Sequence, residues 1–551
     1  MKIRIFTFFI LFFFALQNQA QVTVDYSLMT TLTKEEIQTE LNNQGAPFIT
    51  TLYDVDVYKV SYTTPNVWNT GTTTATGAIA YPKGYLCNVP MASYSHGTTS
   101  SRTGVPSYNS NEVFIGVLYA SLGYAVSMAD LLGLGDDYSS FHPYVHAKSA
   151  ATATIDIIRA SQEIAEDLDV NLSEQLFLFG YSQGGHSTVA AFKEIQENHS
   201  SEFTVTACAG MSGPYDLEGA QTDYVNAGVP YNSPGYLPYL FLGYQEAYGN
   251  LYTSSISEVL VAPYDTTIPP LFDGTNGFGY INSQCTPIPT DMVVPSYQAA
   301  FEADASHPFR VALEENTLMD WVPQSPLRLL YCGEDEQVTG QNAINAAAYY
   351  NANGAPDVAA EELSSTADHN GCVSLCLVRF KFFTDDFVEN PSVYLDDAVL
   401  LDESDAGAMD GAITLVENAD AGTLTYAWSN GDMDNVLDNV SGGNYTVTIT
   451  NTDGCSADFT FDLQTTVSNN NLVRNELAMF PNPVSDILHF DLESGNDYQV
   501  ELMDISGRKI FQGQLNSSLT MDMSSYNDGL YFVSIMNEDA SERFVGKVMK
   551  K

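Results

Sequence analysis

Residues 175–195 read QLFLFGYSQGGHSTVAAFKEI, and this stretch decides the fold class. The run QLFLF at 175–179 is apolar and predicts a short buried strand, whereas the residues from 186 to 195 have the pattern of a helix. Between them lies GYSQG, a G-x-S-x-G motif with Ser182 at its centre. A serine at such a strand–turn–helix junction sits on a sharp turn, where flanking side chains would clash and glycines are tolerated. The alternative is a glycine-rich start of a helix with no chemical role.

The same alternation of strand and helix extends on both sides of this motif, from about residue 22 to residue 390. It is typical of a parallel α/β sheet. The expected strands are 53–63, 74–81, 91–95, 124–129, 175–180, 203–210 and 327–332, and the expected helices are 112–122, 147–166 and 184–197. Residues 213–325 interrupt the pattern and are rich in Pro, Gly and Tyr. Because structureless loops of that length are uncommon, we expect an inserted cap or lid there.

A serine hydroxyl is a weak nucleophile that needs a base and an acid that orients the base. When the serine lies on such a strand–turn–helix junction, the acid follows it in the chain and a histidine base follows the acid. Four histidines follow Ser182 beyond its own helix. His199 ends that helix, His307 lies in the insertion and His489 lies far downstream. Elimination leaves His369, in the loop-like sequence ADHNG.

The acid is expected directly after the strand at 327–332, where the sequence reads GEDEQV. Three neighbouring acidic residues compete for the role, namely Glu334, Asp335 and Glu336. Residue type and spacing alone leave the choice between them open.

A tetrahedral oxyanion needs preorganised N–H donors. One candidate donor is the backbone of Gln183, directly after the serine, and the other lies in the loop after the strand at 91–95. That loop reads HGTT at 96–99, and we choose Thr98 as the second donor, with Gly97 allowing close approach of the backbone. An ordinary turn is the alternative for this short sequence.

Several motifs in the chain together resemble secreted lipases and esterases of the α/β-hydrolase superfamily. They are SHGT at 95–98, DLLGLGDD at 130–137, HPYVHA at 142–147, IDIIRA at 155–160, GYSQGG at 180–185, GEDEQV at 333–338 and His369. The resemblance implies an ester-hydrolysing serine enzyme with an inserted lid and with Asp335 as the acid, because G-x-D-x-x-V resembles the acid loop of these enzymes. Asp130 and His142 are expected to shape the mouth of the pocket or to stabilise a loop near Ser182.

The expected substrate is a small-molecule or lipid ester, with no cofactor and no metal ion. Two alternatives stay open. One is a serine peptidase on the same fold, although the chain has no propeller-like repeat before residue 175. The other is a catalytically inactive protein with a surface-binding or adhesive role.

Charge is distributed unevenly along the 551 residues, which include 68 acidic and 20 basic side chains for a net charge of −48. This balance excludes nucleic-acid binding, which requires Lys and Arg. The 92 residues from Phe382 to Val473 contain 17 acidic residues and no basic one.

Within these 92 residues, alternating runs predict a small antiparallel β-sandwich at 392–466. Its sequences DGAITL, YAWSNG and GNYTVTITNTDGC resemble a short acidic repeat of surface adhesins of Bacteroidota.

Residues 475–551 form the last segment, which follows an Asn-rich linker. The sequences FPNPVSDILHFDL, VELMDISGRKIFQG, MDMSSYNDGLYFVSI and KVMKK closely resemble the C-terminal sorting domain of the type IX secretion system. The resemblance implies a seven-stranded β-sandwich that the type IX machinery recognises as its partner. The mature protein is then either released or attached to the cell surface.

The N-terminal residues 1–20 predict a secretory signal peptide, with Lys2 and Arg4 ahead of an apolar run and Ala20 at the cleavage site. The apolar run, 5–16, is too short to span a bilayer, so we expect export through the periplasm and no transmembrane anchor.

Seven cysteines are an odd count for an exported protein. Cys208 and Cys332 lie in apolar strand-like runs and are expected to be buried thiols. The expected disulfides are Cys87–Cys285 and Cys372–Cys376, with zinc as a weaker alternative for the second pair because no other ligand pair accompanies it.

Overall fold

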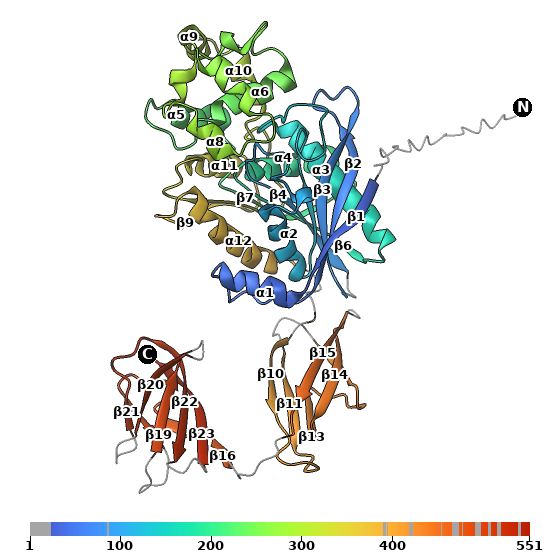
Figure 1. The fold of residues 1–551 in the computed structure, drawn as a ribbon, viewed down its shortest axis with the longest axis vertical. Helices are drawn as coiled ribbons and strands as arrows, with labels where there is room; N and C mark the ends of the chain where they lie inside the picture. The colour runs from blue at the N-terminus through green and yellow to red at the C-terminus, as the bar shows by residue number, and fades with distance from the viewer. Residues whose placement is uncertain are drawn as a thin grey trace, which may run out of the picture. The chain divides into compact units, whose positions relative to one another are not determined.

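A computed structural model describes most of the chain (Figure 1). The described residues are 24–84, 88–388, 393, 395–417, 423–452, 455–465, 473–476, 478–490, 498–504, 508–514, 520–537 and 542–551. The expected signal peptide and Cys87 therefore lie outside them.

The chain divides into two compact units, the first formed by residues 1–396 with 417–426 and 448–458, and the second by the remainder. The acidic segment expected at 392–466 is thus shared between the units.

The first unit is built around a nine-stranded sheet with the strand order β1-β2-β3-β5-β4-β6-β7-β8-β9. Its strands are β1 (Val24–Leu32), β2 (Val55–Pro65), β3 (Thr72–Pro82), β4 (Val89–Ser95), β5 (Ala125–Ala129), β6 (Leu172–Tyr181), β7 (Val205–Met211), β8 (Leu327–Cys332) and β9 (Val358–Ser364). The pairs from β1 to β5 are antiparallel, and those from β5 to β9 are parallel. Each expected strand is present, which confirms an α/β sheet, but the sheet is mixed and not parallel throughout as expected.

Helices cover both faces of this sheet (Figure 1). The helices are α1 (Lys34–Asn43), α2 (Asn111–Ser121), α3 (Ala147–Asp167), α4 (Gln183–Asn198), α11 (Gln341–Ala352) and α12 (His369–Asp385). Side chains alternate along β6, so that Phe177 and Phe179 pack with α1, α2 and α12, whereas Leu176 and Leu178 pack with α3, α4 and α11. Both faces of β6 are therefore buried, which explains its continuous apolar sequence.

A helical insertion connects β7 to β8, in the region where the sequence breaks the α/β alternation. Its helices are α5 (Thr222–Val225), α6 (Tyr236–Tyr248), α7 (Tyr264–Thr267), α8 (Phe278–Ser283), α9 (Pro295–Ala303) and α10 (Pro308–Glu315), with short 3-10 and π turns between them. Figure 1 shows most of these helices gathered at one end of the sheet. The insertion has an apolar core of its own, which includes Tyr244, Phe241 and Phe309.

The C-terminal segments are all-β, as expected. Strands β10 (Leu395–Leu401), β11 (Gly411–Glu417) and β13 (Val436–Val440) form one sheet, and β12 (Thr425–Trp428), β14 (Gly443–Thr450) and β15 (Ser456–Leu463) form another. The last segment has a five-stranded and a three-stranded sheet. Their strands are β16 (Val473–Glu476), β17 (Met479–Phe480), β18 (Ile487–Phe490), β19 (Tyr498–Met503), β20 (Lys509–Gln514), β21 (Thr520–Asp522), β22 (Gly529–Asn537) and β23 (Glu542–Lys550).

Seven of these strands, β17 to β23, lie within residues 478–551, which agrees with the seven that the sequence resemblance implied, and β16 precedes them. The two shortest, β17 and β21, flank β18 in the small sheet. An apolar core that includes Leu488, Val500 and Ile535 joins residues of both sheets, which is the arrangement of a sandwich.

The disulfides differ from the sequence-based expectation. Cys332 is bonded to Cys372, so both the expected Cys332 thiol and the expected Cys372–Cys376 bond are wrong. Cys285 is a free thiol, which also rules out its expected bond to Cys87. Cys208 is free and buried, as predicted. The expectation failed because Cys332 and Cys372 are 40 residues apart and are brought together only by the packing of α12 against β8.

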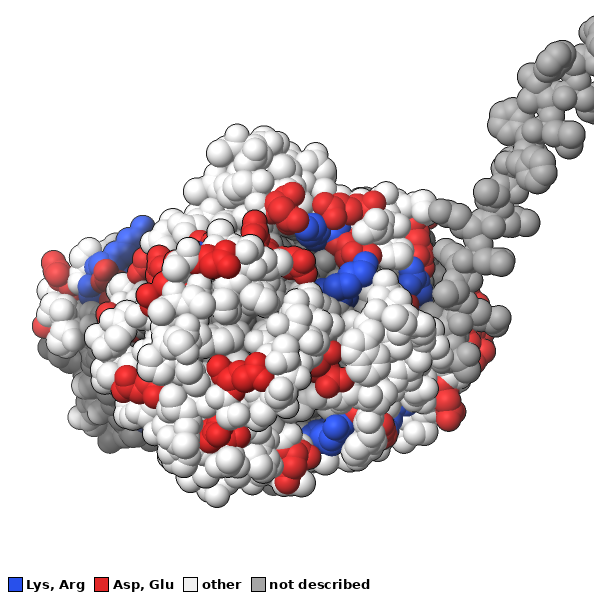
Figure 2. Space-filling view, turned by 90° about the horizontal axis from the view of Figure 1, so that it is seen from above, with Lys and Arg blue, Asp and Glu red and all other residues white. Residues whose placement is uncertain are grey.

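Acidic side chains are scattered over the face seen in Figure 2, with few basic ones between them. Among the residues that the structure describes, no helix is long and apolar enough to cross a membrane.

Candidate active site

Ser182 lies between β6, which ends at Tyr181, and α4, which begins at Gln183. Its backbone has φ 59° and ψ −119°, a strained combination for a residue with a side chain. The neighbouring glycines are sterically required, because a Cβ at Gly184 would lie 1.9 Å from the carbonyl oxygen of Ser95. A Cβ at Gly180 would lie 2.4 Å from the carbonyl oxygen of Gly184. The G-x-S-x-G spacing is thus the spacing that lets the chain turn here.

His369 lies between Ser182 and Asp335 and contacts both. Its Nε2 atom is 3.0 Å from Ser182 Oγ, and its Nδ1 atom is 2.7 Å from Asp335 Oδ2. The expected loop position is slightly wrong, because His369 is the first residue of α12. Asp368 caps this helix by accepting the N–H of Gly371 at 2.7 Å. The cap fixes the start of the helix and so the backbone of His369, and the contact with Asp335 orients the ring.

Asp335 is held by its own loop. Its Oδ1 atom accepts the N–H groups of Gln337 at 3.0 Å and of Val338 at 2.8 Å, which leaves Oδ2 for His369. Its side chain is completely buried. Of the two competing acids, Glu334 is exposed to solvent, whereas Glu336 accepts the backbone N–H of His369 at 3.0 Å. Asp335 is therefore the carboxylate in contact with the imidazole, and Glu336 contacts only the backbone of the same residue.

Gln183 and Thr98, the two candidate oxyanion donors, lie at different kinds of position. Gln183 begins α4, where the first N–H groups of a helix have no partner within the helix. Thr98 lies in the loop after β4, and its Oγ1 atom is 3.0 Å from the hydroxyl of Tyr144. A Cβ at Gly97 would meet only Tyr181 O, at 3.7 Å, so packing alone does not require glycine there.

His142 and Asp130 support the loops around Ser182. The Nδ1–H of His142 donates to Leu132 O at 2.7 Å, and its Nε2 accepts the side-chain amide of Gln183 at 2.7 Å. Burial lowers the pKa of His142 to about 4, so the ring is neutral at neutral pH and can accept this bond. Buried Asp130 accepts hydrogen bonds from Thr76 Oγ1 and from the backbone N–H of Ser107, and it braces the loop after β5.

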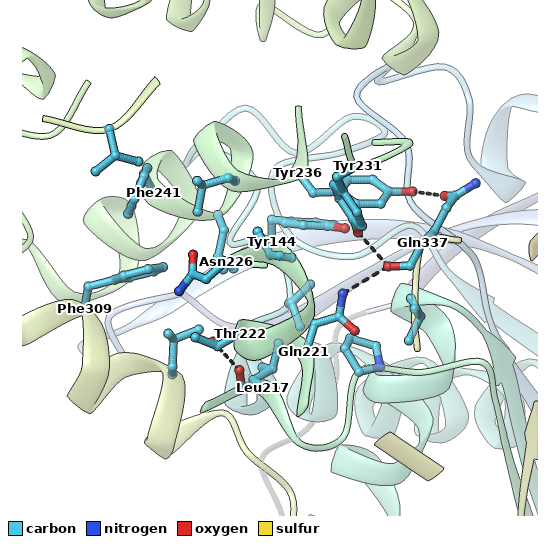
Figure 3. Close-up of a pocket in the computed structure, with 18 of the residues that line it drawn as sticks. Tyr144, Leu217, Gln221, Thr222, Asn226, Tyr231, Tyr236, Phe241, Phe309 and Gln337 are labelled. Carbon is cyan, nitrogen blue, oxygen red and sulfur yellow. Dashed lines mark hydrogen bonds between the residues drawn. The ribbon is translucent and has the colours of Figure 1, made fainter. Parts of the chain in front are cut away.

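A pocket runs from Ser182 and Gln183 into the helical insertion (Figure 3). It contains about 850 Å³ of space free of protein atoms, including the part open to solvent. Its walls are mostly apolar, and those from the insertion include Leu237, Leu240, Phe241, Phe301, Phe309 and Leu313. Pockets with such apolar walls accommodate small apolar molecules.

The insertion is also bonded directly to the loop that carries Asp335. The hydroxyl of Tyr231 donates to Gln337 O at 2.6 Å, and that of Tyr236 donates to Gln337 Oε1 at 2.7 Å. The side-chain amide of Gln221 donates to the backbone carbonyl oxygen of Gln337 at 3.0 Å. Figure 3 shows these bonds converging on Gln337 at one end of the pocket. The insertion therefore helps to hold the acid loop as well as to line the pocket.

Sequence reasoning did not identify Gln337, Tyr231, Tyr236 or Gln221 as part of the site. The abundance of tyrosine in the insertion is the only signal that could have pointed to them. Their common partner lies about 100 residues further along the chain. Within the described ranges, no group of three or more His, Cys, Asp or Glu side chains is arranged to hold a metal ion.

Comparison with family models identifies two regions of the chain. Residues 107–258, which contain Ser182, match the secretory lipase family. Residues 478–551 match the secretion system C-terminal sorting domain. No curated protein matches the chain significantly.

Solved structures similar to the chain are hydrolases. A hydrolase from Legionella pneumophila aligns with a TM-score of 0.62 and 28% identity, over 67% of this chain and 99% of its own. The rice cell wall degrading esterase LipA from Xanthomonas oryzae, in a ligand-bound form, aligns with a TM-score of 0.59 and 28% identity, over 66% of this chain and 97% of its own. These similarities confirm the α/β-hydrolase fold.

The family match and the solved structures point to the same class of protein. The chain is a hydrolase of the lipase and esterase type. Its sorting domain marks it for type IX secretion, so it is a secreted or cell-surface protein.

Proposed function

We propose that this secreted lipase- or esterase-like hydrolase cleaves carboxylic esters of small molecules or lipids through Ser182, His369 and Asp335. The contact of Ser182 Oγ with His369 Nε2 at 3.0 Å, continued by that of His369 Nδ1 with Asp335 at 2.7 Å, is the observation that carries the proposal. The three residues lie on three separate segments of the chain, and all three are buried. Such a chain of nucleophile, base and acid is the arrangement that acyl transfer requires.

In the proposed reaction, Ser182 Oγ attacks the ester carbonyl carbon while its proton passes to His369 Nε2. The carbonyl oxygen becomes an oxyanion, which the backbone N–H groups of Gln183 and Thr98 would stabilise. The imidazolium then gives its proton to the departing alkoxide, so that an alcohol leaves and an acyl-enzyme remains. Water attacks the acyl-enzyme by the same route in reverse, which releases the carboxylic acid and restores Ser182.

Asp335 would orient the ring throughout. Because Asp335 Oδ2 accepts the Nδ1–H of His369, Nε2 is left unprotonated and faces the serine. The carboxylate also stabilises the imidazolium that forms in the transition state. Its other oxygen is satisfied by two backbone N–H groups, so its position does not depend on the histidine alone.

The apolar walls of the pocket favour a substrate whose acyl group is apolar and binds in the pocket. It starts at Ser182 and continues between Leu237, Leu240 and other apolar side chains of the insertion, which would serve as a cap. The free space can hold an aliphatic or aromatic group, which gains binding energy by leaving water. LipA from Xanthomonas oryzae is an esterase, and the likeness of this chain to it at 28% identity favours ester over peptide substrates.

A fluorophosphonate probe tests the proposal, because it labels only an activated serine. The full chain should be labelled, and Ser182→Ala should remove the label without loss of folding. Ser93→Ala removes another buried hydroxyl, one that contacts Ser127 in the sheet, and should leave labelling intact. Folded wild-type protein that is not labelled at Ser182 would disprove the proposal. Hydrolysis of nitrophenyl esters but not of aminoacyl anilides is expected, and the reverse result would assign a peptidase.

A further inference from the structure

The Cys332–Cys372 disulfide joins the two segments that carry Asp335 and His369. Cys332 is the last residue of β8, three positions before Asp335. Cys372 lies in the first turn of α12, three positions after His369. The bond closes a separation of 40 residues, and both cysteines are fully buried. It therefore ties the end of β8, which leads into the acid loop, to the first turn of α12.

Besides the packing of α12 against β8, hydrogen bonds link these two segments. Asp335 contacts the His369 ring at 2.7 Å, and Glu336 accepts the backbone N–H of His369 at 3.0 Å. The N–H of Gly333 also donates to Ser364 O at 2.8 Å, which holds the start of the acid loop to the end of β9. Individual hydrogen bonds make only a small net contribution to stability and can break transiently. The disulfide limits how far the two segments can separate when they do.

We propose that the Cys332–Cys372 disulfide is a positioning element of the active site, and that ester hydrolysis depends on its being oxidised. The proposal rests on the proposed function, since it assigns the bond to the Asp335–His369 pair. A displacement of about 1 Å between catalytic groups can cost 100-fold in rate, and a bond three residues from each partner restricts such displacements. An exported protein meets oxidising conditions in the periplasm, so the enzyme would gain its full activity only after export.

Loss of the bond requires an external reductant. Two thiols, or one phosphine with one water molecule, supply two electrons and two protons, so that the S–S bond breaks and the Cys332 and Cys372 thiols form. The reductant is oxidised to a disulfide or a phosphine oxide. Because both sulfurs are buried, this reaction needs a local opening of the start of α12, and the folded enzyme resists it.

Cys376 provides a matched control within the same cluster of sulfur atoms. Its Sγ atom lies 3.7 Å from that of Cys372, one helical turn further along α12, but it is a free thiol. Burial raises the pKa of the Cys376 thiol, which keeps it protonated and unreactive toward the disulfide at neutral pH. Cys376→Ala therefore removes a buried sulfur beside the bond without cutting it.

The test compares the Cys332→Ala/Cys372→Ala double variant with Cys376→Ala and the wild type, at a temperature well below the unfolding of each. For a short nitrophenyl ester we expect the double variant to lose about 10- to 100-fold in kcat, with KM within about twofold. The rate of fluorophosphonate labelling should fall by the same factor. Cys376→Ala should keep wild-type kcat. A folded double variant with wild-type kcat would overturn the proposal, even if its melting temperature were lower.

Reduction of the wild type gives a second measurement that does not depend on how the double variant folds. Treatment with tris(2-carboxyethyl)phosphine, followed by mass spectrometry of alkylated Cys332 and Cys372, should show activity falling as these two thiols appear and returning on reoxidation. Cys455 is also in a disulfide, which the phosphine can reduce as well. If the phosphine causes no further loss of activity in the double variant, the loss of activity in the wild type is due to the Cys332–Cys372 bond. Full activity with both thiols alkylated would overturn the proposal. Wild type that is never labelled at Ser182 would instead disprove the proposed function.

Discussion

The Nε2 atom of His142 accepts a hydrogen bond at 2.7 Å from the side-chain amide of Gln183, the residue that directly follows Ser182. The direction of this bond is set by the other ring nitrogen, because Nδ1–H donates to Leu132 O. A residue about 40 positions upstream of the serine thus holds the side chain of a proposed oxyanion donor. His142 acts through Gln183 and does not face the pocket that contains Ser182.

Replacing His142 by Phe should therefore lower kcat while leaving substrate binding nearly unchanged. The change keeps a flat ring but removes the acceptor, so the Gln183 side chain loses its partner and its backbone N–H is held less firmly. We expect kcat to fall about tenfold with KM within about twofold, measured by steady-state hydrolysis of a nitrophenyl ester.

The control for this variant is His146→Phe, which alters another buried histidine of the same loop. His146 contacts Ser149 at the start of α3 and not Gln183. This control should lose stability but keep kcat. Equal losses of kcat in both variants would show that the His142 contact has no special role.

The choice of Asp335 over its acidic neighbours can be tested with isosteric amides. Asp335→Asn should lower kcat by about 10³- to 10⁴-fold, because the amide oxygen stays with the backbone N–H groups of Gln337 and Val338 and turns the NH2 group toward Nδ1. This favours the wrong tautomer of His369, and a neutral amide does not stabilise an imidazolium as a carboxylate does. Glu336→Gln keeps an oxygen that can accept the His369 backbone N–H, and we expect a loss of less than tenfold. Steady-state kinetics on both variants decide the matter, and a larger loss in Glu336→Gln would reassign the acid.

The preference of the enzyme for acyl chains of a given length should depend on the insertion. Leu240 of α6 lines the pocket, whereas Leu242 of the same helix does not. Leu240→Trp should fill part of the pocket and lower kcat/KM for dodecanoyl esters at least tenfold, while acetyl and butyryl esters change less than threefold. Leu242→Trp is the matched control and should leave the chain-length profile unchanged. The measurement is a nitrophenyl-ester series, and a uniform loss over all lengths would contradict this use of the pocket.

Three buried histidines should make the stability of the first unit depend on pH. Burial lowers the pKa of His142, of His146 and of His186 to about 4 each, below the ordinary 6.5. Between pH 6.5 and pH 4 the unfolded chain therefore binds protons that the folded chain does not, and stability falls as the pH falls through this window. Each pKa unit corresponds to about 1.4 kcal/mol for each histidine.

Calorimetric unfolding between pH 4 and pH 7 measures this dependence. Removing one of these groups with His186→Gln should reduce the slope of the unfolding free energy against pH, whatever it does to stability at pH 7. His489→Gln, in β18 of the C-terminal segment, should leave the slope for the first unit unchanged. A melting temperature that is constant across the window would contradict the burial of neutral imidazoles.

The parts of the site that sequence analysis located are those with local signals. The run at 175–195 contains the strand, the turn and the helix that present Ser182, and the glycine spacing follows from clashes within a few residues. His369 was reached by elimination along the chain order. The structure brings His369 into contact with Ser182 and Asp335 into contact with His369.

The parts that sequence analysis missed depend on contacts between distant segments. Cys332 lies in an apolar strand and looks like a core thiol, but α12 places Cys372 against it. The bonds from Tyr231 and Tyr236 to Gln337 likewise require the insertion to fold over the acid loop. Residue type carries no record of such pairings, because a buried tyrosine or cysteine satisfies the same local pattern with many partners.

By itself, the sequence determined the α/β class, the position of Ser182 on a sharp turn and the C-terminal sorting domain, because each depends on patterns within a few tens of residues. Only the tertiary structure decided which carboxylate contacts His369, which cysteines are bonded and where the pocket runs. Residue type and spacing left Glu334, Asp335 and Glu336 open, with only the family resemblance favouring Asp335, and the folded chain gives each of them a different environment. The physical reason is that these contacts form between segments far apart in the chain, when the helices and the insertion pack against the sheet.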